Sequence, residues 1–300
     1  MSSLLLPAII SSPLPFPTLA RMKAIDQQSV LKIGAGQVVV SLSVAIKELL
    51  ENSLDAGASS IEIRLKEYGL QSIQVSDNGI GIPSSDFDLL CKRNRTSKLQ
   101  SFSDLENLSS FGFRGEALNS LALTCKEVVI TTKSKEENCV GFKLTFRGDK
   151  LITKETMARS EGTCVMLNQL FHSFPVRRRE FEKNFKREFQ KSISLMQSYA
   201  IISTNVKISC FNMKNQESEM IFQTFGNATI KENAMNIFGV KMIASLTSFN
   251  WPIENYEFEG LISTSSGRSS GDRQYIFVNG RPTDQAKVKL LLMKDYKSIQ

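Results

Sequence analysis

The chain is 300 residues long, with 41% hydrophobic and 22% charged residues and a formal net charge of +7. That length allows one large domain or two smaller ones, and the composition is ordinary for a globular protein. The basic balance favours an anionic partner such as nucleic acid. No apolar run in the sequence reaches the ~18 residues that cross a bilayer, so we expect no membrane partner.

Cysteine and histidine usage excludes several kinds of catalytic and metal site. The five cysteines are widely spaced without a C-x-x-C pair, which argues against structural zinc and favours reduced thiols in the cytosol or nucleus. The only histidine in the sequence, His172, has no nucleophile motif near it. We therefore expect His172 to be structural or on the surface, and not part of a Ser-His-Asp triad.

The first elements follow from composition and periodicity. Residues 1–22 are apolar and Ser-rich but contain four prolines, so we expect a disordered extension, with an organellar-targeting segment as the alternative. A helical pattern runs over 29–56, punctuated by the glycines of "GAGQ". Residues 60–82 alternate with period two around "EYGLQ" and predict an antiparallel hairpin. Residues 84–110 are polar and indicate a long loop with short helical pieces.

The remaining elements are strands and three helices, of which the first is long. Residues 127–171 contain three or four strand patterns, and 176–200 predicts a helix with phenylalanines along one stripe and basic residues along another. A further hairpin follows ("VKISCFN", "MIFQTF"), and near 226–232 the composition changes. Beyond it we expect a helix, two strands and a terminal helix. The predicted domains are 1–22 (disordered extension), 23–226 (first domain) and 227–300 (partial second domain).

The stretch "AIKELLENSLDAGA" (45–58) predicts a helix with an unusual acidic face. Its apolar residues recur at helical spacing, whereas Glu48, Asn52 and Asp55 fall on the opposite side with Glu51 beside them. Only Lys47 is close enough to offset their charge. In the following hairpin, Asp77 stands in register with inward-pointing residues. A carboxylate aimed at the interior needs a hydrogen-bond donor.

These pieces match the needs of a nucleoside triphosphate with magnesium. The sequence lacks G-x-x-x-x-G-K-[ST] and G-x-G-x-x-G, which excludes a P-loop and the usual dinucleotide fingerprint. Asn52 offers an uncharged Mg²⁺ ligand, and Glu48, one turn away, can activate a water for attack on the γ-phosphate. Asp77 can accept the exocyclic N–H of adenine. Backbone N–H groups over 112–118 can cradle phosphates at a helix N-terminus.

Each of these signals alone has an ordinary explanation. A polar helix face is normally solvated, "DNG" is a common turn, and "KRNRTSK" is usually a wet loop. The pattern E-x-x-x-N is expected about once by chance in a chain of this length. The order and spacing of the pieces together favour nucleotide binding.

The motifs "KELLENSLDAGA", "DNGIGI", "TSK", "GFRGEAL" and "GTCVMLNQLF" resemble those of the GHKL ATPases, and specifically the MutL family of DNA mismatch-repair proteins. The segments "YAIISTNVKISC" and "GRSSGDRQYIFVNGRPTDQAKV" are similar to its eukaryotic PMS-type branch. The resemblance runs from about Lys23 to Val288. It implies an α/β fold, an α+β sandwich of the Bergerat type with a mixed sheet and helices on one face. A smaller, incomplete βαβ domain of the kind found in ribosomal proteins would follow.

The resemblance implies roles for individual residues in an ATP-binding and ATP-hydrolysing site. Glu48 matches the general base, Asn52 the Mg²⁺ ligand and Asp77 the adenine contact. The other expected nucleotide contacts are Asp55, Gly79 and Gly81, then Thr96, Ser97 and Lys98 of the ATP lid, then Gly112, Phe113, Arg114, Gly115, Glu116, Ala117 and Leu118 of the phosphate loop, and Thr163.

The resemblance also implies partners. ATP would order the lid and close a clamp over DNA together with an MLH-type partner, in a nuclear repair pathway that includes MutS-type mismatch-recognition proteins. DNA would be held through its phosphates, with weak sequence preference. The candidate basic residues are Arg178, Arg179, Lys183, Lys186 and Arg187, with Lys92, Arg93 and Arg95 in the lid. A solvated helix face explains the stripe equally well.

Two departures from the family pattern affect the expected activity. The family's further lysine, which reaches the γ-phosphate from the second domain, has no counterpart before Gln300. We therefore expect hydrolysis by this chain to be reduced or partner-dependent. Turnover should also be slow, because a long lid must close before a water is aligned. The C-terminal endonuclease and dimerisation region has no counterpart either, so we expect a longer natural product or a truncated one. One alternative is a nucleotide-bound DNA-binding scaffold without appreciable hydrolysis. Another is a GHKL kinase or topoisomerase subunit, but the presence of the "GFRGEAL" motif counts against it.

Overall fold

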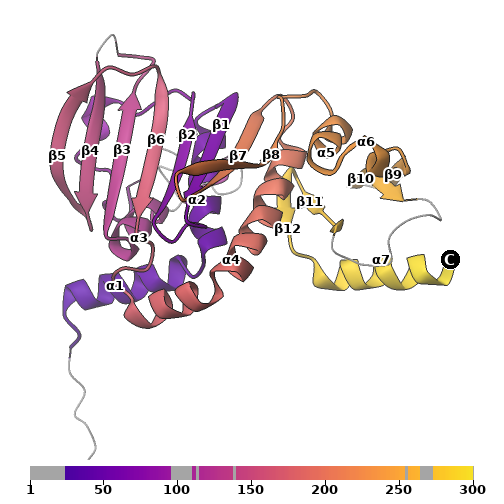
Figure 1. Ribbon diagram of the computed structural model, residues 1–300, viewed down its shortest axis with the longest axis horizontal. Helices are drawn as coiled ribbons and strands as arrows, with labels where there is room; N and C mark the ends of the chain where they lie inside the picture. Colours follow the sequence, from indigo (N-terminus) through magenta and orange to yellow (C-terminus); the bar gives the residue numbers. More distant parts are fainter. Residues whose placement is uncertain are drawn as a thin grey trace, which may run out of the picture.

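A mixed sheet of eight strands forms the main body of the structure (Figure 1). The structure is a computed structural model that describes residues 24–95, 110–112, 115–137, 140–253, 256–263 and 273–299. The strand order is β5-β4-β3-β6-β2-β1-β7-β8, with β1 and β7 parallel and the other neighbours antiparallel. This confirms the expected mixed sheet. The strands are β1 Ser60–Lys66, β2 Ser72–Asp77, β3 Glu127–Lys133, β4 Gly141–Arg147, β5 Lys150–Met157, β6 Gly162–Asn168, β7 Lys207–Lys214 and β8 Glu217–Gln223.

The hairpin of β1 and β2 confirms the period-two pattern. Every second residue of β1 is buried, because alternate side chains point to the packed face of the sheet. The turn uses left-handed backbone at Glu67 (φ 50°) and Tyr68 (φ 58°), before Gly69. The hairpin brings Asp77 to the end of β2, where it pairs directly with Thr163 on β6.

Two helices replace the single helical stretch expected over 29–56. α1 (Gln27–Val38) and α2 (Leu42–Asp55) lie at 88° to each other. The second helix begins after Ser41, whose Oγ accepts the Val44 amide as an N-cap. The predicted interruption at the glycines of "GAGQ" was wrong, because those glycines lie inside α1. Among the described helices none is long and apolar enough by itself to cross a membrane, although this bent pair passes the same test on length and composition.

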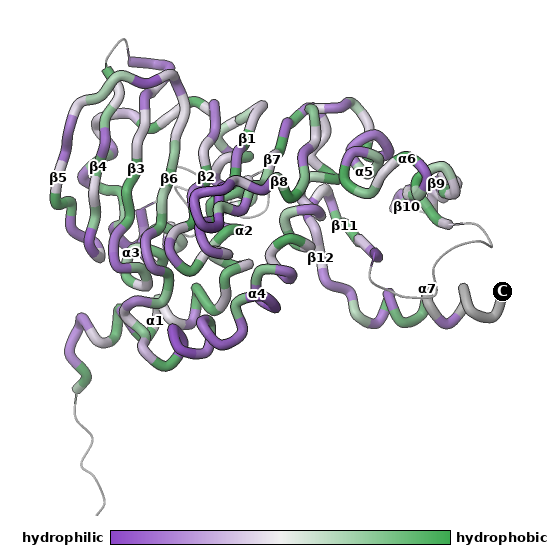
Figure 2. Tube along the Cα trace, in the orientation of Figure 1, coloured by the Kyte–Doolittle hydropathy of each residue, from purple (hydrophilic) through white to green (hydrophobic). Residues whose placement is uncertain are grey.

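Helices α3 (Ala117–Thr124) and α4 (Pro175–Ile202) join α1 and α2 along one side of the sheet (Figure 1). α4 confirms the predicted stripe, since Phe181 and Phe189 are buried and Phe185 packs partly buried against the same core. Hydrophilic and hydrophobic residues follow one another along this helix (Figure 2). Its backbone leaves helical geometry at Asn184 (φ −112°, ψ 17°), so the two halves of α4 have different directions.

The described residues after β8 form two hairpins and three helices. The strands β9 and β12 were not predicted, because each contains a proline, which cannot donate to a ladder. A two-stranded sheet tolerates this, since each strand has one free edge. Each hairpin is a separate sheet in the described part of this unit, so the βαβ crossover and the domain boundaries stay predictions. The elements are α5 Ile230–Phe238, α6 Val240–Ile243, β9 Leu246–Ile253, β10 Tyr256–Ser263, β11 Ile276–Val278, β12 Arg281–Thr283 and α7 Ala286–Ile299.

Arg177 fastens the start of α4 to the end of α1. Its Nη1 donates to the carbonyl oxygens of Gly36 (2.6 Å) and Val39 (2.9 Å), two groups at a helix end that lack partners within the helix. The guanidinium also lies 5.6 Å from the ring centres of Phe171 and Phe174. A cation at a helix C-terminus is favourable as well, because it faces the negative end of the helix dipole.

We expect Arg177→Ala to lower the free energy of unfolding by about 1–3 kcal/mol, because two carbonyl groups lose a charged donor. Urea unfolding followed by circular dichroism measures this difference. The control is Arg179→Ala, an exposed arginine two positions further along α4, which should change stability by less than ~0.5 kcal/mol. Equal midpoints for the two variants would contradict the role given to Arg177.

Candidate active site

Asp77, the last residue of β2, accepts three hydrogen bonds from the protein. Its Oδ2 accepts the Ser53 hydroxyl at 2.9 Å, and its Oδ1 accepts the backbone N–H groups of Gly79 (2.9 Å) and Thr163 (3.2 Å). The protein itself therefore supplies the expected donor, and the contact between Asp77 and adenine stays a prediction. An ionised carboxylate has about four acceptor positions, so one position remains for a further donor.

The electrostatics of Asp77 follow from its position. Burial raises the pKa of its carboxyl, and the hydrogen bonds from Gly79, Ser53 and Thr163 oppose that increase without cancelling it. A carboxylate with a raised pKa is more basic than usual. It is therefore a good acceptor for an N–H donor that reaches it.

Two glycines after Asp77 have no room for a side chain. A Cβ on Gly81, which has a φ of +74°, would lie 2.1 Å from the carbonyl oxygen of Lys133. A Cβ on Gly79 would lie 2.8 Å from the Cβ of Ala56 and 3.0 Å from the Asp77 carboxylate. These glycines are required by the protein's own packing, and their predicted approach to a base stays a prediction.

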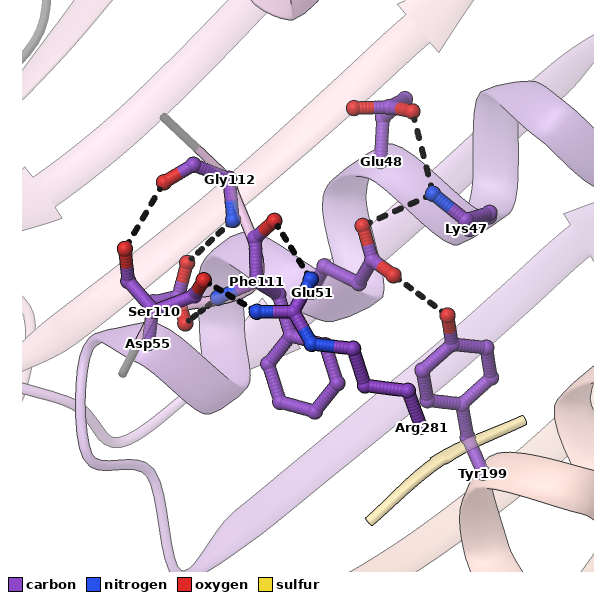
Figure 3. A network of polar contacts seen from close by, with 9 residues as sticks. All are labelled: Lys47, Glu48, Glu51, Asp55, Ser110, Phe111, Gly112, Tyr199 and Arg281. Atoms are coloured by element: carbon purple, nitrogen blue, oxygen red, sulfur yellow. Dashed lines mark hydrogen bonds and ion pairs between the residues drawn. The ribbon is translucent and has the colours of Figure 1, made fainter. Parts of the chain in front are cut away.

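The acidic face of α2 is partly neutralised inside the protein (Figure 3). Lys47 donates to Glu51 at 2.9 Å and lies 3.4 Å from Glu48, which confirms that Lys47 offsets this face. Glu51 is only 6% exposed and also accepts the hydroxyl of Tyr199 from α4. Burial and this bond raise the pKa of the Tyr199 phenol, so it remains a donor.

Asp55, at the end of α2, holds the backbone that leads into the predicted phosphate loop. Its Oδ1 accepts the Phe111 N–H at 2.8 Å and its Oδ2 accepts the Gly112 N–H at 3.0 Å (Figure 3). The Gly112 amide, expected to face a phosphate, is thus bonded to Asp55. A direct contact between Asp55 and nucleotide stays a prediction.

Glu48 and Asn52 lie one helical turn apart on α2, with the Glu48 side chain 21% exposed and Asn52 exposed. The described residues contain no group of three or more His, Cys, Asp or Glu suited to a metal ion. A magnesium ion that takes most of its ligands from phosphates and water needs only one protein oxygen, which the Asn52 amide can supply. The residues present therefore fit such an ion.

Several predicted residues lie around the start of α3. Gly115 has a φ of +63°, and Glu116 forms a 3.2 Å ion pair with Arg93. Ala117 and Leu118 are the first residues of α3, so the predicted turn into a helix is confirmed. The remaining candidates lie outside the described residues: Thr96, Ser97, Lys98, Phe113 and Arg114.

The predicted basic stripe of α4 divides into two kinds of residue. Arg178 is structural, since its Nη1 donates to the carbonyls of Leu70 and Leu170 at 3.0 Å and its Nε donates to Glu182 at 2.6 Å. The other four are exposed: Arg179, Lys183, Lys186 and Arg187. His172 is exposed, as expected.

Four residues of the site were not singled out from the sequence. Ser53 stands on the apolar side of α2, and its polarity there was a usable signal for a buried acceptor nearby. Glu51 was noted only as a neighbour of the acidic face. Tyr199 and Arg281 carry no local signal, because their contacts depend on the packing of distant elements.

Two family models match the chain. The first, described as histidine kinase-, DNA gyrase B- and HSP90-like ATPase, covers residues 40–171. The second, described as DNA mismatch repair protein, C-terminal domain, covers residues 234–300. The first match includes Glu48, Asn52, Asp77 and Thr163.

Curated relatives extend over nearly the whole chain. The mismatch repair endonuclease PMS2 of Gallus gallus is 42% identical over 298 residues, which cover 92% of this chain and 34% of the relative. The DNA mismatch repair protein PMS1 of Arabidopsis thaliana is 42% identical, over 96% of this chain and 32% of its own length. The chain thus spans about a third of the length of these relatives.

Solved structures agree with these matches. The N-terminal domain of a DNA repair protein is 35% identical, with a TM-score of 0.78 over 90% of this chain and 84% of that one. The MutL ATPase domain of Aquifex aeolicus, complexed with ADP, shares the fold at 24% identity, with a TM-score of 0.63 over 86% and 88% of the two chains. The chain therefore belongs to the MutL family of DNA mismatch-repair proteins, in its eukaryotic PMS-type branch, and contains a GHKL-type ATPase domain.

Proposed function

We propose that this chain binds ATP with magnesium at the end of β2 and along α2, and hydrolyses it slowly. The observation that carries the proposal is the Asp77 carboxylate, which is fixed by Ser53, Gly79 and Thr163 and has one acceptor position left. The exocyclic amino group of adenine is a donor of the right kind for that position. Guanine presents a carbonyl oxygen there instead, which a carboxylate repels.

Glu48 is the proposed general base. Its carboxylate is partly exposed, and Lys47 is the described partner at 3.4 Å, so it can reach a water without losing a close structural bond. Glu51 is a poor candidate for the same role, because it is buried and already accepts from Tyr199 and Lys47. Asn52, one turn further, would hold magnesium, which when bound neutralises the phosphate oxygens.

We propose further that the chain acts in DNA mismatch repair in the nucleus, where ATP closes a clamp over DNA together with an MLH-type partner. Relatives named mismatch repair endonucleases support this assignment. MutS-type mismatch-recognition proteins would be further partners. The exposed basic residues of α4 would contact DNA phosphates.

The adenine contact predicts a nucleotide preference. We expect ATP with magnesium to bind at least ~100-fold more tightly than GTP, because the remaining acceptor position of the Asp77 carboxylate would face a carbonyl oxygen of guanine without a donor. Calorimetric titration of both nucleotides measures the ratio. Asp77→Asn should abolish the preference, whereas the exposed control Asp88→Asn should retain it. Equal affinities of the unmodified chain for ATP and GTP would overturn the assignment of Asp77.

The general base predicts a separation of binding from hydrolysis. Glu48→Ala should bind ATP within about threefold of the unmodified chain but hydrolyse it at least ~100-fold more slowly in single-turnover assays with an MLH-type partner. The control is Glu219→Ala, an exposed glutamate on β8. Unchanged hydrolysis in Glu48→Ala would contradict the role. Binding without turnover in the unmodified, partnered chain would favour the alternative of a nucleotide-bound DNA scaffold.

The α4 surface predicts salt-dependent DNA binding. The double variant Lys183→Ala and Arg187→Ala should weaken binding to duplexes of any sequence and reduce the slope of log K against log salt by about 2, because two phosphate contacts disappear. Fluorescence anisotropy over a salt series measures both quantities. The control is Lys150→Ala, which removes an exposed lysine from β5, the edge strand at the other end of the sheet from β8. An unchanged slope in the double variant would mean that this face is merely solvated.

A further inference from the structure

One arginine of the second unit reaches the segment that leads into the phosphate loop. Arg281, on β12, donates from Nη2 to the Ser110 carbonyl at 2.5 Å and from Nη1 to the Phe111 carbonyl at 3.4 Å. Its guanidinium lies 5.1 Å from the centre of the Phe111 ring (Figure 3). The contact therefore joins two units that are about 170 residues apart in sequence.

The same two peptide groups are held from the other side by Asp55. The peptide between Ser110 and Phe111 gives its carbonyl to Arg281 and its N–H to Asp55, at 2.5 and 2.8 Å. The next peptide, between Phe111 and Gly112, repeats the arrangement at 3.4 and 3.0 Å. Two successive peptide dipoles thus lie between a carboxylate and a guanidinium. Each end is a charge-assisted hydrogen bond, which is stronger than a neutral one.

The clamp also contacts the acidic face of α2. The Phe111 ring lies 6.0 Å from the Tyr199 ring, and the Tyr199 hydroxyl donates to Glu51. Glu51 in turn holds Lys47, which lies beside Glu48 (Figure 3). Packed side chains therefore run without a gap from Arg281 to the proposed general base.

We propose that Arg281 is a positioning residue, which with Asp55 clamps the Ser110–Phe111 and Phe111–Gly112 peptides and so sets the phosphate loop for nucleotide. The proposal rests on the proposed ATP site. An arginine is required because its planar fork serves two carbonyls while its face covers an aromatic ring. A lysine offers neither the fork nor the flat face. The position of the β11–β12 hairpin thereby controls how well the loop is held.

The clamp can be tested without any nucleotide. In the full chain, Arg281→Ala should increase amide hydrogen exchange at Phe111 and Gly112 about tenfold, the size expected for losing a coupled contact. Arg281→Lys should give an intermediate increase in exchange at the same amides. This variant replaces Arg281→Ala in the test if the alanine variant fails to fold. The control Arg273→Ala removes an arginine from a comparable position, 5.2 Å above the Phe238 ring within the second unit, and should leave both amides unchanged.

A double-variant cycle identifies the two ends of the clamp. Asp55→Asn should also raise exchange at these amides, and combining it with Arg281→Ala should raise exchange by clearly less than the product of the single effects. Multiplicative effects would mean that the two side chains act independently, which overturns the clamp. Unchanged exchange in both Arg281 variants would overturn it as well.

ATP titration then tests whether the clamp serves the site. Arg281→Ala should weaken ATP binding about fivefold, with Arg273→Ala unchanged, because a loose loop must be ordered on binding. Raised exchange with unaltered ATP affinity would overturn the positioning role. Failure of the unmodified chain to bind ATP would instead overturn the proposed function, while the exchange measurements would still decide whether the clamp exists.

Discussion

Two carboxylates at the ends of α2 and β2 accept hydrogen bonds from neutral donors, and the arrangement of the whole site depends on this pairing. Asp77 accepts a hydroxyl and two backbone N–H groups, and Asp55 accepts two further backbone N–H groups. Backbone donors have fixed positions, because the strands and turns that carry them are fixed by ladders and packing. A carboxylate bonded to them therefore joins elements in a single geometry, here α2 with β2, β6 and the Ser110–Gly112 segment. A cation on a flexible stem would neutralise the charge equally well without this positional control.

The parts of the fold that sequence predicts well are those where local periodicity and burial coincide. The β1–β2 hairpin and the four strands of 127–171 have clear patterns, and α4 buries the phenylalanine stripe that its spacing predicts. The break between α1 and α2 was misplaced because glycine is a strong local signal, whereas the actual stop depends on the Ser41 N-cap. The strands β9 and β12 were missed because proline usually argues against a strand, and only the pairing partner decides whether the lost donor matters.

The candidate site shows the same division. Glu48, Asn52 and Asp77 follow from spacing and register, because a helix turn and a strand pleat determine which side chains share a face. The partners of these residues come from tertiary packing: Tyr199 is 148 positions from the glutamate it bonds. No pattern within a short window can show which distant donor fills an acceptor position. The requirement for a donor was predictable for Asp77, but Ser53 as its source required the structure.

The negative charge of the α2 face explains why the proposed function needs a metal ion. Neutral donors fix carboxylates without cancelling their charge, so among the described residues the α2 face has more negative than positive groups even with Lys47 in place. A triphosphate is itself anionic and would be repelled by this face, which is the physical reason a magnesium ion belongs to the proposed function. Arg281 relieves part of the same imbalance from a distance, because the two peptide dipoles between it and Asp55 align with the field of both charges. The second unit thus contributes positive potential to the site through backbone groups, and any movement of its hairpin changes the electrostatics of the loop together with its geometry.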